Sequence, residues 1–250
     1  MIEFPSTTVV NRILSKEKFI EHLDLTASLK RKLTSDIEHF KIINKFADST
    51  LNFSALPVAD DEENGEVDNE KARVTEILLL QITLKKPDFD QKLIETIAGQ
   101  NPHKLVFLLR CEKYARLAIY YQRLYICAWQ KYEDVSLELR GKSVSELWRS
   151  FVSQIALHSF DSVDRPEDNT AKVGTTENVV NKQILDNTLE LRNKAEALKK
   201  EIETLETKKH REVQTRRQFA MHKKILQLKQ EYEQVVAKLL GNLKEGISKP

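Results

Sequence analysis

The stretch from residue 181 to residue 240 contains neither glycine nor proline, the two residues that interrupt helices most strongly. It is rich in lysine, glutamate, leucine, glutamine and alanine, which favour helical backbone. We therefore predict a long C-terminal coiled-coil helix over residues 181–243, or a helical hairpin within the same limits.

Apolar residues in this stretch form two blocks with the 4-3 spacing of a coiled coil. The second block is shifted by two positions relative to the first, so the two cannot belong to one continuous seam. An isolated heptad seam needs a second helix to bury it, which predicts association with a protein partner or with a second copy. Thr188 and Ala195 occupy alternate core positions of the first block. The predicted interface residues are Ile184, Leu191, Leu198, Ile202, Leu205, Met221, Ile225, Leu228, Tyr232, Val235 and Leu239.

Between the blocks lies "ETKKHREVQTRRQ" (206–218), which has almost no apolar residue. Residues 204–229 hold eight bases and two acids, a local net charge of +6. Three interpretations are open: a solvated stretch joining two packing sites, the tip of a helical hairpin, or a surface that binds nucleic-acid phosphates. No tyrosine or tryptophan lies among the bases, so base stacking is not indicated. The candidate phosphate-binding residues are Lys208, Lys209, Arg211, Arg216, Arg217, Lys223 and Lys224.

The 250 residues allow one substantial domain in addition to this appendage. Residues 1–157 are predicted to form an α+β domain with a mixed sheet, and the turn-rich residues 158–180 a linker. Seven acids crowd the segment 60–70, which predicts a solvated loop.

Within the N-terminal domain the segment "VTEILLLQITLKK" (74–86) predicts the clearest strand, and "TLNFSA" (50–55) predicts a shorter one. Helices are predicted over residues 88–99 and 144–157, the second with an apolar face that closes the domain.

No motif in the sequence indicates a reaction. The segment "RGKS" (140–143) lacks the earlier glycine of a phosphate-binding loop, because Ser136 stands at that position. The six histidines have no metal-ligand spacing, and Cys111 and Cys127 are expected to be reduced, buried thiols. We therefore predict no metal, no cofactor and no enzymatic activity.

The order of elements between residues 26 and 112 is similar to the core of restriction-endonuclease-like nucleases. Such sites need carboxylates for the metal and a lysine beside the attacking water. Lys85 fits the lysine position, but Thr83 stands where a carboxylate is required, and Asn52 and Ser54 supply no charge on the neighbouring strand. The resemblance implies at most a degenerate nuclease-like core.

The N-terminus has no basic segment followed by an apolar one, and no uncharged apolar run approaches the roughly 18 residues that span a bilayer. We expect a soluble cytoplasmic protein without membrane contact. Its net charge is only +2, so any attraction to nucleic acid must be local.

Four segments together resemble a family of uncharacterised prokaryotic proteins known only as a domain of unknown function. They are "FPSTTVVNRILSKEKF", "EILLLQITLKK" with "KLIETIAGQNPHKLVFLL", "LRGKSVSELWRSFVSQIA", and the charged stretch beginning "LRNKAEALKKEIETLETKKHREV". The resemblance covers nearly the whole chain. It implies genes located beside DNA methylases, helicases and restriction-type nucleases of phage-defence loci, and it supplies no catalytic residues.

The leading hypothesis is a non-catalytic accessory or scaffold subunit of a DNA restriction or anti-phage defence assembly, joined through its coiled coil to a helicase, methylase or nuclease subunit, or to itself. A second hypothesis is a nucleic-acid-binding module that uses residues 204–229. A third is a degenerate or divergent nuclease that uses Lys85.

Overall fold

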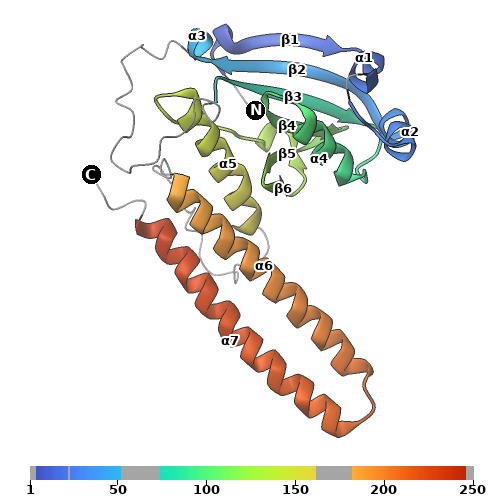
Figure 1. The fold of residues 1–250 in the computed structure, drawn as a ribbon, viewed down its shortest axis with the longest axis vertical. Coiled ribbons are helices and arrows are strands. Elements are labelled where there is room, and N and C mark those ends of the chain that lie inside the picture. Colours follow the sequence, from blue (N-terminus) through green and yellow to red (C-terminus); the bar gives the residue numbers. More distant parts are fainter. Residues whose placement is uncertain (1–3, 22, 52–73, 162–181, 246–250) are drawn as a thin grey trace. The chain divides into compact units, whose positions relative to one another are not determined.

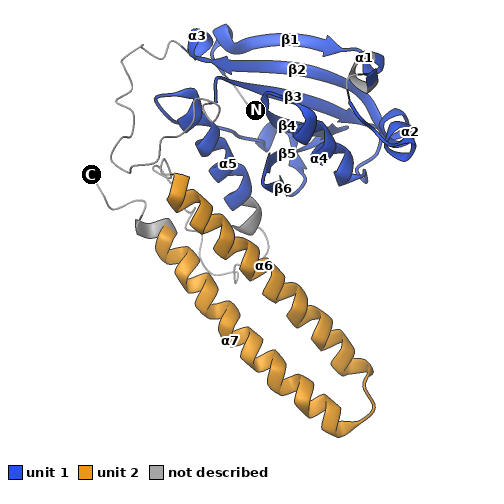
Figure 2. Ribbon diagram, viewed as in Figure 1, with its two compact units in different colours: residues 1–167 blue, residues 168–250 orange. Residues whose placement is uncertain are grey.

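A computed structural model describes residues 4–21, 23–51, 74–161 and 182–245, and the chain divides into two units, residues 1–167 and 168–250 (Figure 2). The predicted acidic loop, the greater part of the predicted linker, and residues 52 and 54 lie outside the described residues.

The first unit is α+β and contains a mixed sheet, which confirms the predicted fold class at this level (Figure 1). The strands follow the order β1-β2-β3-β4-β5-β6, and β7 also pairs with β5. All described neighbours are antiparallel except β3 and β4, which are parallel and are connected by α4. The strands are β1 (Val9–Leu14), β2 (Ile37–Ala47), β3 (Glu76–Leu84), β4 (Lys104–Cys111), β5 (Tyr114–Tyr121), β6 (Arg123–Ile126) and β7 (Gln130–Lys131). The helices of this unit are α1 (Lys16–Glu21), α2 (Ala27–Asp36), α3 (Asp48–Leu51), α4 (Gln91–Gln100) and α5 (Val144–Asp161), with 3-10 turns at Ser6–Thr8 and Tyr132–Asp134.

Helices cover both faces of this sheet, and β2 contributes a buried phenylalanine to each face. The register of β2 against β3 shifts between Ile42 and Asn44, and an inserted residue reverses which face the following side chains occupy. Phe40, before the shift, belongs to the core beneath α2 and α4. Phe46, after it, meets Phe151 of α5 edge to face, with ring centroids 5.4 Å apart.

The segment "RGKS" (140–143) immediately precedes α5 and caps its start. The Ser143 hydroxyl accepts a hydrogen bond from the Glu146 backbone N–H at 3.2 Å, and the Glu146 carboxylate accepts one from the Lys142 backbone N–H at 2.7 Å. This is a variant of the capping box, in which a serine and a glutamate satisfy the free donors of a helix start. Gly141 precedes it with a φ of 129°, a conformation that other residues rarely adopt.

The predicted strand over residues 50–55 is wrong in its first two residues, which belong to α3. The cause is local: the Thr50 hydroxyl donates to the carbonyls of Lys45 and Ala47 and accepts from the Ala47 N–H. Side-chain bonds of this kind replace the ladder bonds of a strand. Between residues 26 and 112 the described residues form α2, β2, α3, β3, α4 and β4, and this order does not confirm a restriction-endonuclease-like core.

The second unit consists of two helices, α6 (Lys182–Arg211) and α7 (Thr215–Glu245), joined by residues 212–214 (Figure 1). Of the two predicted alternatives the described residues show the helical hairpin and not the single continuous helix, since the chain reverses direction at this turn and the two helices pack side by side. None of the helices in the described ranges is both long enough and apolar enough to cross a bilayer.

Candidate nucleic-acid interface

The buried face of α7 follows the heptad positions that the sequence predicts. Two of the six predicted residues, Met221 and Tyr232, are half-buried. The other four are buried: Ile225, Leu228, Val235 and Leu239. Because α6 packs along α7, this seam is covered by the same chain.

The buried face of α6 agrees with the predicted seam only in part. Ala195 and Thr188 are buried as alternate core positions. Near the start of the helix Ile184 is 37% exposed, and Leu185 and Leu189 are buried in its place. The helix begins with two possible apolar stripes, and spacing alone does not distinguish them. Of the remaining predicted residues, Leu198 and Ile202 are buried, and Leu191 and Leu205 are half-buried.

Ion pairs connect the two arms along their exposed sides. The Lys224 ammonium lies 2.7 Å from a carboxylate oxygen of Glu201, and the Lys229 ammonium lies 2.8 Å from one of Glu206. The hydrogen bond from Lys229 lowers the pKa of Glu206. Lys224, a predicted phosphate-binding residue, is therefore already paired within the hairpin.

The turn between the arms is closed by a glutamate. The Glu212 carboxylate accepts hydrogen bonds from the backbone N–H groups of Val213, at 3.1 Å, and Gln214, at 3.0 Å. The Gln218 side chain donates to the Glu212 carbonyl. These bonds satisfy backbone groups that a helix end leaves open, which explains how the chain reverses without glycine, proline or asparagine.

The turn brings the ends of two basic segments together. The last turn of α6 holds Lys208, Lys209 and Arg211, where the helix dipole favours positive charge. The first turn of α7 holds Arg216 and Arg217 and no acid, where the dipole disfavours positive charge. The seven predicted bases therefore lie at and near one end of the hairpin.

Most of these bases are available to a ligand. Among the described residues no ion pair involves Lys208, Arg211, Arg216 or Lys223, and all four are exposed. The side chain of Arg217 is 66% exposed and lies 3.9 Å from Glu212. Lys209 is half-buried, with its ammonium 3.4 Å from Nδ1 of His222.

Two apolar residues in the same region are exposed, and the sequence analysis did not select them. Val213 in the turn is 90% exposed and Phe219 on α7 is 72% exposed. The sequence does contain a sign that Phe219 is unusual. The heptad spacing that starts at Leu205 reaches Phe219, whereas the buried seam of α7 runs through Met221. Base stacking was not expected because no tyrosine or tryptophan lies among the bases, but the phenyl ring of Phe219 also offers a flat aromatic face.

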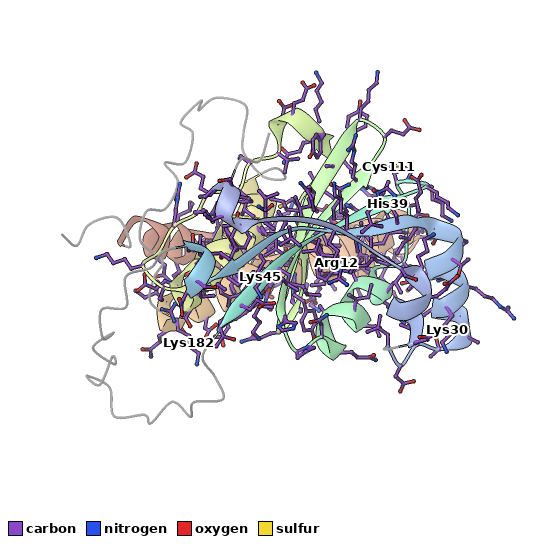
Figure 3. All side chains as sticks on the ribbon, turned by 90° about the horizontal axis from the view of Figure 1, so that it is seen from above. Arg12, Lys30, His39, Lys45, Cys111 and Lys182 are labelled. Carbon is purple, nitrogen blue, oxygen red and sulfur yellow. The ribbon has the colours of Figure 1, made fainter. Side chains whose placement is uncertain are left out.

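The residues compared with a nuclease site form bonds within the protein. The Thr83 hydroxyl lies 3.1 Å from Nε2 of His39 on β2, which Figure 3 labels, and the Gln81 amide donates to Thr83 at 3.4 Å. Lys85 follows the end of β3, and its ammonium donates to the Thr34 carbonyl at 3.2 Å. In the part of the chain that the structure describes, no three histidine, cysteine, aspartate or glutamate residues are grouped so that they could hold a metal ion.

Comparison with known proteins connects the chain to one family. No curated protein and no solved structure matches it. A family described as "Domain of unknown function (DUF4391)" matches residues 2–232, which include the whole α/β unit as described, α6, the turn and most of α7. The chain belongs to this family, the domain of unknown function DUF4391.

Proposed function

We propose that this protein is a non-catalytic, nucleic-acid-binding accessory subunit whose helical hairpin contacts phosphates with its tip. The observation that carries the proposal is the meeting of two basic helix ends at one turn, with Lys208, Arg211, Arg216 and Lys223 exposed and outside any ion pair in the described residues. Interspersed lysines and arginines on a rigid helix can neutralise several phosphates without reading base sequence.

This distribution of positive charge destabilises the hairpin when no ligand is bound. Like charges repel across the turn, and Arg216 and Arg217 lie in the helix turn where the dipole opposes them; each such placement costs about 0.3–1 kcal/mol at low salt. A polyanion would remove both penalties.

The hairpin also changes the role assigned to the heptad residues. Since α6 and α7 cover each other, association through residues such as Ile225 and Leu228 would require the arms to separate. We therefore propose that the hairpin acts as an arm carrying a basic tip. The resemblance to proteins encoded beside DNA methylases, helicases and restriction-type nucleases supports a place in a DNA restriction or phage-defence assembly.

The proposal is tested by fluorescence anisotropy with a labelled DNA oligonucleotide at several salt concentrations. The wild-type affinity should fall steeply with salt, with a slope of log K against log salt of about −0.7 to −0.9 per phosphate contacted. The triple variant Arg211→Glu, Arg216→Glu, Arg217→Glu should lose most of this affinity and flatten the slope.

A matched control reverses three exposed bases of the same hairpin outside the tip, Lys182, Lys200 and Lys238. It changes the net charge of the chain by the same amount. If both triple variants bind equally well, or if the tip variant binds like the wild type, the tip is not the interface.

A further inference from the structure

An aromatic ring lies exposed within the basic surface of α7. Phe219 is 72% exposed, although water contact with a phenyl ring is unfavourable and the helix has a buried seam that could take it. The neighbouring seam residues Met221 and Ile225 turn toward α6, which leaves Phe219 on the outer side of α7.

The ring is placed between two cations. Residues three and four positions apart on a helix are neighbours on its surface, so Arg216, Phe219 and Lys223 form one row. All three are exposed. The two bases are separated by about 10 Å along the helix axis at the usual rise of 1.5 Å per residue. Along the helix the row therefore presents a positive charge, a flat aromatic ring and a second positive charge.

This succession matches a single strand of nucleic acid better than a duplex. Proteins that bind single strands combine a positive surface along the backbone with aromatic side chains on which bases stack. In a duplex the base faces are already stacked, and the ring would have no surface to meet. An acidic protein segment would need the cations but no stacking ring.

We infer that Phe219 stacks on an unpaired base of single-stranded nucleic acid while Arg216 and Lys223 contact the flanking phosphates. The inference rests on the proposed function and specifies the class of ligand. The strand is bound without sequence preference, because every base offers a face for stacking.

The experiment measures the affinity of the full chain for a labelled 20-nucleotide thymidine strand and for a duplex of equal length. Phe219→Ala should weaken single-strand binding about tenfold, within the range that loss of one stacked base produces, and should leave duplex binding within about twofold. Phe219→Trp should keep the single-strand affinity. Leu226→Ala is the matched control, since Leu226 is a 50% exposed apolar residue of the same helix without a ring; it should bind like the wild type. Circular dichroism of each variant verifies that the helices are retained.

The outcomes separate this inference from the proposed function. If the tip charge reversal removes binding but Phe219→Ala has no effect, or weakens both ligands equally, the stacking contact is wrong and the phosphate-binding tip stands. If charge reversal has no effect, the proposed function fails as well. If polyglutamate competes with the thymidine strand equally well per charge, the partner is an acidic protein surface and the inference is overturned.

Discussion

The carboxylate of Glu212 accepts a hydrogen bond from the backbone N–H of Gln214, 3.0 Å away, at the point where α6 ends and α7 begins. This contact lies in a segment that has no residue with a strong preference for turns. The Glu212 side chain thus stabilises the turn that sets the directions of α6 and α7, and basic residues lie on both sides of this turn.

Replacing Glu212 with alanine should loosen this turn. We expect the free energy of unfolding to fall by about 1 kcal/mol, because two backbone donors lose their acceptor. Amide hydrogen exchange at Val213 and Gln214 should accelerate. Glu212→Gln keeps an acceptor oxygen and should exchange more slowly than the alanine variant. Unchanged exchange in Glu212→Ala would show that the carboxylate does not hold the turn.

The ion pair between Glu201 and Lys224 should contribute to the pairing of the arms. Both side chains are about half exposed, so the pair should stabilise the hairpin by only about 0.2–1 kcal/mol. Glu201→Lys should lower the melting temperature, and adding Lys224→Glu should restore it. The control variant is Glu203→Lys, at an exposed position of α6. Adding Lys224→Glu to this control should not raise its melting temperature. A double variant no more stable than Glu201→Lys alone would contradict the antiparallel register.

Stability should depend on acid through Asp90, the N-cap of α4. The hydrogen bond from the Lys32 ammonium, 2.6 Å away, lowers the pKa of Asp90, against a smaller opposing effect of burial. Because the folded pKa is below the unfolded value of about 4, the stabilisation is complete above that value. It is lost as the pH falls through the folded pKa.

Urea unfolding at neutral and acid pH tests this dependence. Asp90→Asn retains a capping side chain but carries no charge. The wild type should therefore be more stable than Asp90→Asn at pH 7, and the difference should shrink as the pH falls below the unfolded pKa of Asp90 and through its lowered folded pKa. Lys32→Met should remove the same pH-dependent contribution to the free energy of unfolding. A difference that stays constant with pH would rule out the ion pair as its source.

Gly141 should not tolerate a side chain. A Cβ there would lie 2.8 Å from the Cβ of Glu146 and 2.9 Å from the backbone nitrogen of Leu147, and the φ of 129° is strained for alanine. Gly141→Ala should lower the free energy of unfolding by about 1–3 kcal/mol. Gly99→Ala, in α4 with open space around the added carbon, should instead stabilise by about 0.4–1 kcal/mol. Equal stability of the two variants would contradict the capping geometry at α5.

Local patterns were sufficient where one strong signal covers a whole element. The apolar run of β3 and the amphipathic face of α5 have few competing arrangements, and both elements form, although α5 continues to Asp161, beyond the predicted end at residue 157 and into the predicted linker. The start of α4 lies three residues later than predicted, because Asp90 caps the helix. At Thr50 the pattern of a strand was outweighed by hydrogen bonds from one hydroxyl to nearby carbonyls.

The sequence indicates which residues belong to the candidate interface, but it does not show how they are arranged on the surface. All seven bases were proposed from the sequence, which does not distinguish Lys224, paired with Glu201, from Lys223, which has no ion pair among the described residues. Phe219 was assigned no role, since its exposure depends on which side of α7 meets α6.

The helical character of most of residues 182–243 and the assignment of the two apolar blocks to different seams follow from the sequence alone, because helix propensity and side-chain period are local properties that add along the chain. The reversal of the chain at 212–214, the burial of Leu185 in place of Ile184, and the meeting of two basic helix ends at one turn appear only in the folded protein. Those outcomes depend on contacts between residues distant in sequence, and no local pattern contains them.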